Sequence, residues 1–204
     1  TPNFSSKSTE KYLNKLGFIN VETVNFSNIY SLSDSVQISP LKSGDFREDS
    51  GLYINAGGKE LLFTVDSNFL NSHKLPKNIT LLATSFASGA SGYPLIYENL
   101  TEEQKNKIIR RNKNSTKSEV MNYLKLVKPA YYLPYAGMFM EKAKRDHYIL
   151  KTNKKVLIDE YSDICEALNI KLIRPDKNVS FFFNNNNDIK IKNTPQNIKF
   201  VENS

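Results

Sequence analysis

The chain has 204 residues, enough for one domain that buries roughly 70 % of its unfolded surface, so it needs no disulfide or metal to fold. Two histidines (His73 and His147) and one cysteine (Cys165) exclude an internal disulfide, a zinc finger, a four-cysteine iron–sulfur cluster and a three-histidine metal centre. The net charge is +7. No apolar run approaches the roughly 20 residues that cross a bilayer, and the polar N-terminus is unlike a signal peptide. We therefore expect a soluble, cytoplasmic α/β or α+β protein.

The N-terminal third reads as one helix followed by short strands. The helical pattern runs from Ser5 to Leu16 and ends at Gly17, where a glycine stop is expected. Segments typical of strands follow at Phe18–Val24, Val36–Ser39, Leu52–Asn55 and Glu60–Val65. The last two are joined by Ala-Gly-Gly-Lys at residues 56–59, a favourable hairpin turn, which predicts an antiparallel meander.

A buried strand and a long helix come next. Residues 79–84 are a compact apolar segment, typical of a strand buried on both faces. The stretch from Thr101 to Lys128 is helical in pattern, and Thr101 with Gln104 predicts a capping box. The polar residues 112–117 leave open whether this is one helix or two.

The remaining sequence repeats this order and ends in a hairpin. Ala130–Leu133 predicts a second buried strand, and Val156–Leu168 an amphipathic helix. Val179–Phe183 and Asp188–Lys192 predict a hairpin with an all-asparagine tip. Two strand–loop–helix passages after an antiparallel meander predict a mixed sheet with covering helices.

A loop of small residues follows the first buried strand, where α/β sheets place their ligands. Its glycines and serines can turn backbone amides and hydroxyls toward an anion. The alternative is a tight turn that needs small residues for packing. The candidate anion- or substrate-binding residues of this loop are Ser88, Gly89, Ser91, Gly92 and Tyr93.

Two aspartates are candidate metal or substrate ligands. Asp66 comes directly after a predicted strand, a position that also commonly caps the next turn. Asp45 belongs to an acidic cluster with Glu48 and Asp49, whose ordinary explanation is a solvated loop. Two further candidates are His147 and Tyr135, although an ordinary surface histidine is the favoured explanation of His147.

Positive charge is concentrated in one part of the chain. Residues 102–155 hold 14 Lys and Arg against 5 Asp and Glu. Such an excess attracts anions at long range, although a solvated helix face is the ordinary explanation. Because no aromatic residues interleave these charges as in nucleic-acid-binding motifs, we favour an anionic small molecule over nucleic acid. We expect no membrane partner, since no apolar run is long enough to cross a bilayer.

Five segments of the sequence occur in an order typical of one family. They are Asp49–Gly51, Thr64–Asp66, Leu75–Pro76, Phe86–Pro94 and Pro134–Phe139. Together they resemble the metallo-β-lactamase-fold domain of the CMP-N-acetylneuraminate hydroxylase-like proteins, from about Lys11 to Asn153. The loop Phe86–Pro94 is the most specific of the five.

The resemblance implies an αβ/βα sandwich of two similar halves, with metal ions at the rim between them. It also implies that this chain is the C-terminal portion of such a domain. The family's signature His-x-His-x-Asp-His is absent from the sequence, and Thr1 falls just downstream of its place. Asp66 matches a metal-facing aspartate, and Asp45 stands near the place of a metal-binding histidine. Ala143 stands where relatives have a histidine. The cofactor implied for the complete domain is a divalent metal such as Fe, Zn or Mn, although this chain by itself need bind none.

Three functions remain open from the sequence. The first is a portion of a metal-dependent hydrolase or oxygenase that acts on an anionic, nucleotide-sugar-like substrate, completed by an upstream segment or a partner chain. The second is a non-catalytic scaffold or interaction module that has lost its metal site. The third is a nucleic-acid-binding face at residues 102–155. We assign residues 1–175 to the partial domain and 176–204 to a hairpin and tail of the same unit.

Overall fold

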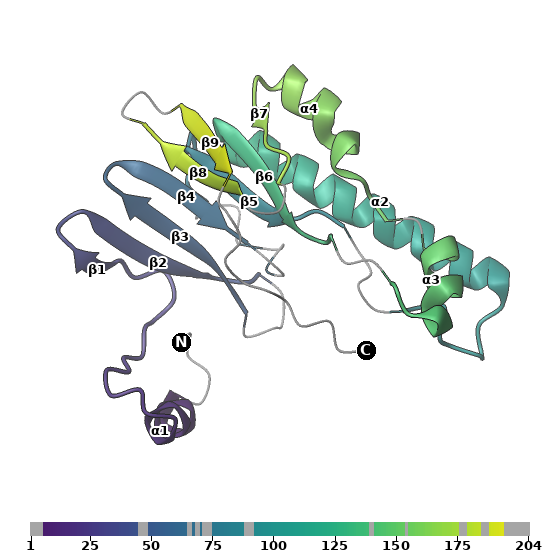
Figure 1. Cartoon of the computed structure of the whole chain (residues 1–204), viewed down its shortest axis with the longest axis horizontal. Coiled ribbons are helices and arrows are strands. Elements are labelled where there is room, and N and C mark those ends of the chain that lie inside the picture. The colour runs from purple at the N-terminus through teal and green to yellow at the C-terminus, as the bar shows by residue number, and fades with distance from the viewer. Residues whose placement is uncertain are drawn as a thin grey trace.

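A seven-stranded mixed sheet organises the chain (Figure 1). The structure is a computed structural model, and it describes residues 6–44, 49–64, 67, 70, 75–87, 92–138, 141–153, 155–175, 179–184 and 188–193. The strands, in chain order and in order across the sheet, are β1 (Tyr30–Ser33), β2 (Val36–Lys42), β3 (Ser50–Ala56), β4 (Lys59–Phe63), β5 (Leu81–Ser85), β6 (Tyr131–Ala136) and β7 (Lys171–Leu172).

The direction of the strands changes in the middle of the sheet. Strands β1 to β4 are an antiparallel meander, and β4 to β7 are mutually parallel. The turn between β3 and β4 places Gly57 and Gly58 at φ values of +57° and +79°, as the sequence predicts for this hairpin. The predicted mixed sheet is therefore confirmed.

Helices α2 (Glu102–Val127) and α4 (Ser162–Ala167) cover one face of the parallel strands (Figure 1). The other helices are α1 (Ser6–Lys15) and α3 (His147–Thr152), and the 3₁₀ turns are η2 (Lys144–Asp146) and η3 (Ile158–Tyr161). The predicted capping box is present, because Thr101 Oγ1 accepts from Gln104 N at 3.3 Å and Gln104 Oε1 accepts from Thr101 N at 2.8 Å. The question of one helix or two is answered: α2 is continuous over 26 residues.

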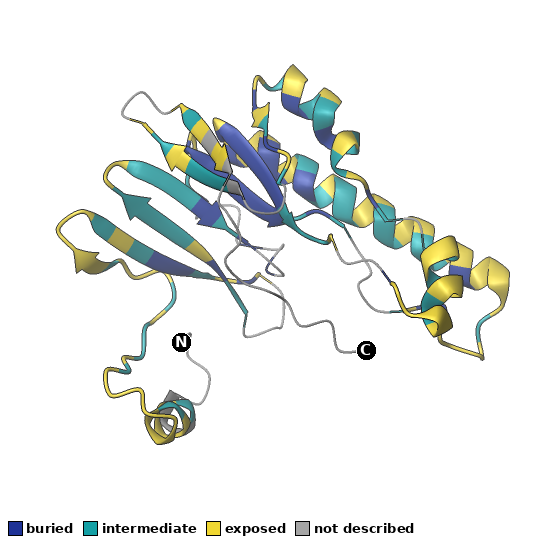
Figure 2. Ribbon diagram, viewed as in Figure 1, coloured by how far each residue is buried: buried dark blue, intermediate teal, exposed yellow. Residues whose placement is uncertain are grey.

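Each face of the parallel strands carries its own core. On the helical face, Leu82 and Tyr132 pack with Leu124 of α2 and Cys165 of α4. On the opposite face, Leu81, Ala83 and Leu133 pack beneath the hairpin formed by β8 (Val179–Phe183) and β9 (Ile189–Asn193). Figure 2 shows β5 and β6 as the most buried strands, which confirms that they are covered on both faces.

Several predicted elements differ in the structure. Phe18–Val24 is not a strand: Phe18 and Ile19 are 59 % and 88 % exposed, and an alternating pattern without a pairing partner does not form a ladder. The helix predicted over Val156–Leu168 is shorter, because η3 and α4 divide it. Strands β1 and β7 and helix α3 have no counterpart among the predicted elements, and all three are short. Among the described residues, no helix has both the length and the apolar character needed to cross a membrane.

Candidate functional site

The carboxyl ends of the parallel strands lie along one edge of the sheet, where ligands of α/β proteins bind. The loops after β4, β5 and β6 leave from this edge (Figure 1). In the sequence, Asp66 follows β4, the small-residue loop follows β5, and Tyr135 is the last residue but one of β6. The fold therefore directs the predicted site segments to one side of the molecule.

The described residues that follow β4 are buried and hydrogen-bonded. Thr64 and Ser67 are both fully buried, Thr64 N donates to Ala83 O at 3.0 Å, and Ser67 N donates to Thr64 O at 2.8 Å. The hydroxyl of Ser67 has no hydrogen-bond partner among the described residues. Asp66 itself lies outside the described residues.

A second buried hydroxyl lies where β2 ends. Ser43 forms an isolated antiparallel bridge with Leu70, and its own hydroxyl has no partner within the described part of the chain. Leu70 N donates to the phenolic oxygen of Tyr123 at 2.7 Å. This hydrogen bond anchors Leu70 to helix α2. The segment that leads to Asp45, also outside the described residues, is therefore held beside the segment that follows Asp66.

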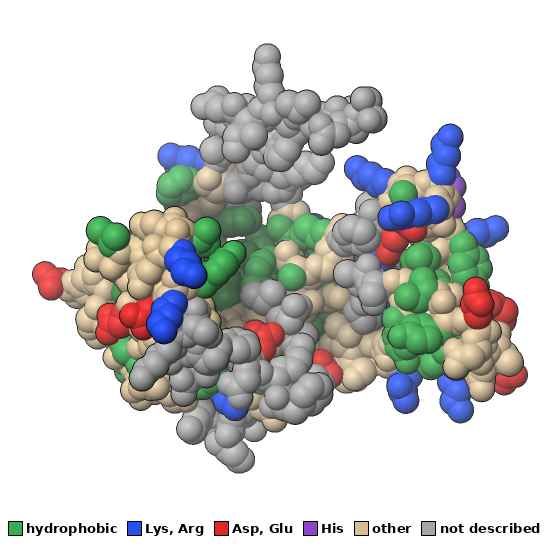
Figure 3. Space-filling model, turned by 90° about the horizontal axis from the view of Figure 1, so that it is seen from below, with side chains coloured by type: hydrophobic (Ala, Val, Ile, Leu, Met, Phe, Trp, Pro, Cys, Tyr) green, Lys and Arg blue, Asp and Glu red, His purple; other side chains and the backbone are tan. Residues whose placement is uncertain are grey.

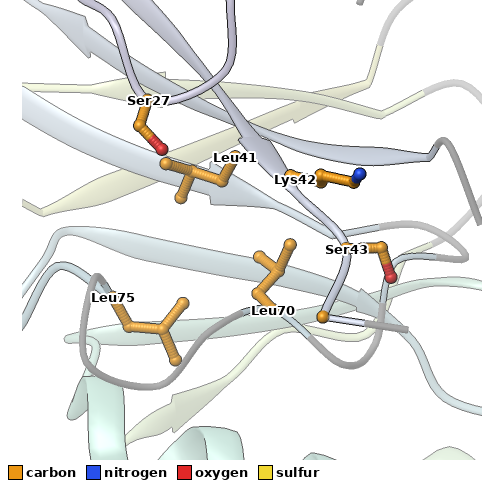
Figure 4. A pocket seen from close by; sticks show the side chains of 7 residues that line it. Ser27, Leu41, Lys42, Ser43, Leu70 and Leu75 are labelled. Carbon is orange, nitrogen blue, oxygen red and sulfur yellow. The ribbon is translucent and has the colours of Figure 1, made fainter. Parts of the chain in front are cut away.

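A cavity of about 150 Å³ lies between these segments. Figure 4 shows side chains from both sides of it: Ser27, Leu41 and Ser43 on one side, Leu70 and Leu75 on the other. Leaving a buried hydroxyl unpaired costs about 1–3 kcal/mol, so such a group in a native protein needs an explanation, and a functional role is one. The two serines therefore make the ends of β2 and β4, the strands that precede Asp45 and Asp66 in the sequence, the candidate site.

The described residues do not fit a metal centre by themselves. Among them, no group of three His, Cys, Asp or Glu side chains is placed to hold an ion. The polar side chains that line the cavity are two serine hydroxyls and the ammonium group of Lys42, whereas the metals expected here prefer imidazole or carboxylate. We therefore assign no chemical step to a metal ion.

The start of the small-residue loop is anchored by two hydrogen bonds to the backbone of Phe86. Phe86 N donates to Ala136 O at 2.9 Å, and the hydroxyl of Tyr161 donates to Phe86 O at 2.8 Å. Gly137 has φ +120°, and a Cβ there would stand 2.9 Å from both the backbone N and the Cβ of Ala87. The backbones after β5 and β6 thus approach so closely that only glycine fits at residue 137.

The rest of the predicted loop is described only in part. Ser88, Gly89 and Ser91 lie outside the described residues. At Gly92, a Cβ would stand 2.7 Å from Ile96 and 2.9 Å from Ile149 of α3, so packing accounts for this glycine. Tyr93 is 40 % exposed, stacks edge to face with Tyr97 at 5.4 Å, and precedes Pro94 through a cis peptide bond.

The two remaining candidates lie apart from the buried serines. Tyr135 is half-buried and packs edge to face on Phe63, at a centroid distance of 5.9 Å, on the face that the β8–β9 hairpin covers. His147 is exposed at the first position of α3. Cys165 is packed in the core, as the sequence predicts, and burial raises the pKa of its thiol to about 11.

Sequence reasoning missed Ser43, Ser67 and the ion pairs at the ends of β5 and β6. Lys155 Nζ lies 2.9 Å from Glu141 Oε1, and Lys113 Nζ lies 2.9 Å from Glu160 Oε1. Nothing in the local sequence distinguishes these serines from other serines or these lysines from other surface lysines. Their burial and pairing depend on segments far apart in the chain.

The chain is similar to hydroxylases of a nucleotide sugar. No family model matches the sequence. It is 32 % identical over 149 residues to a Xenopus laevis protein named cytidine monophosphate-N-acetylneuraminic acid hydroxylase, an alignment that covers 71 % of this chain and 25 % of that protein. Proteins of the same name from Mus musculus and Asterias rubens are 31 % and 34 % identical over 143 and 123 residues, which cover 69 % and 56 % of this chain and 25 % and 19 % of those proteins. The chain therefore spans about a quarter or less of the length of these curated relatives.

Proposed function

We propose that this chain is part of an oxygenase that hydroxylates a CMP-activated acidic sugar. The supporting observation is its identity of 31–34 % with proteins named hydroxylases of cytidine monophosphate-N-acetylneuraminic acid. Their name favours an oxygenase over the hydrolase that the sequence leaves open. The positive excess of residues 102–155 is consistent with an anionic substrate.

We place the reactive end of the substrate at the carboxyl edge of β4, near Asp66 and Asp45. The bridge between Ser43 and Leu70, which brings the two aspartate-bearing segments together, supports this assignment. So do the buried hydroxyls of Ser43 and Ser67, which have no partner within the described residues. In the proposal, any metal ion takes its further ligands from outside the described residues.

We also propose that the sheet is one half of a metallo-β-lactamase-like αβ/βα sandwich. The support is an apolar face on β2 and β3, opposite the helices. Ile38 pairs with Ile54, and Leu52 pairs with Phe63, so these side chains share the face on which the β8–β9 hairpin packs farther along the sheet. Leu52 is 37 % exposed, and Ile38 and Ile54 are half-buried. A second sheet, supplied by an upstream segment or a partner chain, would cover them.

A turnover assay tests the proposed activity. The parent protein for this assay is the polypeptide that carries this chain together with the proposed second sheet. It is incubated with CMP-N-acetylneuraminic acid, dioxygen and a reductant, and the product is analysed for the mass of one added oxygen atom. We expect Asp66→Asn to lower kcat by about 100-fold or more, because it removes a charged ligand. Asp34→Asn, in the exposed turn between β1 and β2, is the control and should keep full activity. Normal turnover by the Asp66 variant, or no turnover by the parent protein, would contradict the proposal.

The non-catalytic alternative predicts a different result. A scaffold that has lost its metal site would bind no stoichiometric Fe, Zn or Mn and would give no product. Metal analysis of the purified protein, together with the assay, separates the two. Stoichiometric metal that is lost in Asp66→Asn would rule out the scaffold.

A further inference from the structure

A groove lies beside the carboxyl ends of β5 and β6, between α2 and residues 150–160. Its volume is about 650 Å³, within the range of roughly 300–1,000 Å³ typical of small-molecule sites. Phe86 and Gly137, at the ends of the two strands, belong to its wall, so the groove adjoins the edge to which we assign the chemistry.

One wall of the groove is apolar and open to solvent. Met138, Leu150 and Leu157 line it, and they are 45 %, 44 % and 66 % exposed. The fully buried Val156 lies between them and the core. Large apolar side chains that remain exposed around a hollow suit the face of a flat ring, because such a ring would remove them from water.

A buried ion pair lines the same groove. The side chains of Glu141 and Lys155, 2.9 Å apart, are only 6 % and 14 % exposed. Removing two charges from water costs about as much as their attraction returns, so such a pair adds little to stability. Its position at the wall of a groove is better explained by recognition of a polar ligand.

Every carboxylate that lines the groove has a cationic partner. Glu141 pairs with Lys155 and Glu160 with Lys113, both within the lining, and Asp159 pairs with Arg174, which lies outside it.

Glu160 has two cationic partners: Lys113 Nζ, in the lining of the groove, lies 2.9 Å from it, and Lys117 Nζ, outside the lining, lies 3.4 Å from it. Partial burial opposes the ionisation of Glu160, but hydrogen bonds from Lys113, from the backbone of Leu157 and from Lys117 outweigh it and hold the pKa of this carboxyl below its usual range. Glu160 is therefore ionised at neutral pH, and one of the two ammonium charges is left to attract an anion.

We propose that this groove binds the nucleoside monophosphate half of the substrate, an inference that rests on the proposed function. The phosphate lies near Lys113, and the base lies against the apolar wall that includes Leu157. Hydrophobic, basic and acidic side chains line the groove together, the combination that a nucleotide requires. Figure 3 shows that side chains of these three kinds lie close to one another on the face seen from below the view of Figure 1. The sugar to be hydroxylated then extends toward the end of β4.

Calorimetric titration with cytidine monophosphate tests this inference. We expect Lys113→Met and Leu157→Ser each to raise the Kd by about tenfold or more. Leu157 is 66 % exposed, so its replacement leaves folding intact even if the change at Lys113 disturbs the Glu160 cluster. The matched controls are Lys107→Met, exposed on α2, and Leu126→Ser, 43 % exposed on the same helix and outside the groove lining; both should bind as the parent protein does.

The outcomes separate this inference from the proposed function. Unchanged Kd values in both groove variants would overturn the groove assignment while leaving the hydroxylase proposal intact. So would binding of the CMP-sugar by the parent protein without any binding of cytidine monophosphate. If the parent binds neither compound, both the groove assignment and the proposed function fall. A tenfold loss in both variants, with normal binding in both controls, supports the groove.

Discussion

Single residues at the carboxyl edge are fixed by contacts that the local sequence does not encode. Gly137 is required because the backbone of Ala87 leaves no room for a Cβ. Tyr123 is required because its phenolic oxygen accepts the backbone N–H of Leu70, 53 residues away in sequence. Both residues hold the loops in which the candidate site residues lie.

We expect Gly137→Ala to destabilise the protein by about 2–4 kcal/mol, because it adds a steric clash to an unfavourable φ. Gly58→Ala is the control: its φ is also positive at +79°, but a Cβ there meets nothing within 4 Å. It should cost only about 1 kcal/mol. Urea denaturation of both variants checks this, and equal losses would show that the approach of Ala87 has no energetic consequence.

Tyr123 should make stability depend on alkaline pH. Desolvation by burial raises the pKa of its phenol from 10.0 to about 12. The folded state therefore holds this proton more tightly than the unfolded chain, so the contribution is complete below pH 10 and is lost as pH rises from 10 toward 12.

We expect Tyr123→Phe to lower stability by about 1–3 kcal/mol at neutral pH, because Leu70 N loses its acceptor, and to reduce the loss between pH 10 and 12. Urea unfolding at a series of pH values measures both effects. Tyr12→Phe, at a position 63 % exposed, is the control and should change neither. An unchanged alkaline slope in the Tyr123 variant would contradict this explanation.

Among the elements, α2 depends on both local and tertiary interactions. Its start is local, because Thr101 and Gln104 form the capping box that the sequence predicts. Its continuity through the polar residues 112–117 has tertiary support, because Lys113 and Lys117 pair with Glu160 of η3. Of these three residues, Lys113 and Glu160 also line the proposed nucleotide groove.

Removal of the cap should weaken the helix in a predictable way. We expect Thr101→Ala to cost about 0.5–2 kcal/mol, since Gln104 N loses the side-chain oxygen to which it donates. Ser118→Ala, at an exposed position within the same helix, should be neutral or slightly stabilising because alanine has the higher helix propensity. Thermal unfolding followed by circular dichroism distinguishes the two variants, and an equal Tm for both would mean that the cap contributes nothing.

At the scale of the whole molecule, the two faces of the sheet are covered unequally. The helices cover one face of the parallel strands, and the β8–β9 hairpin covers part of the other, where Ile189 N donates to Tyr131 Oη at 3.2 Å. The apolar side chains of β2 and β3 on that second face remain half-exposed. The proposed sandwich follows from this asymmetry.

The sandwich predicts that substitutions on this face matter most when the second sheet is present. We expect Leu52→Lys to change the stability of residues 1–204 alone by less than about 1 kcal/mol, because the side chain is 37 % exposed. In a polypeptide that also carries the second sheet, burial of the charge should cost about 2–4 kcal/mol. Ile19→Lys, at a position 88 % exposed, should have little effect in either case. Equal small losses for Leu52→Lys in both proteins would argue against a covering sheet.

Much of the fold was predictable because its signals are local. The Gly57–Gly58 turn, the cap at Thr101 and the apolar run before Ser85 each depend on a few adjacent residues, and each is confirmed. Short elements such as β7 and α3 were missed, since two or six residues carry too little periodicity. The prediction of a strand over Phe18–Val24 was wrong, because a strand needs a neighbouring strand to pair with and the sequence of the segment does not show whether one is present.

The sequence alone determined the class of the fold, the limits on metal chemistry set by two histidines and one cysteine, and the similarity to nucleotide-sugar hydroxylases. The tertiary structure alone decided which polar groups are buried together. The pairing of Ser43 with Leu70, the close approach of Gly137 to Ala87 and the pairing of Lys155 with Glu141 join segments that are separate in the chain. The physical reason is that burial and electrostatic pairing depend on distances in space, whereas composition and periodicity record only neighbours along the chain.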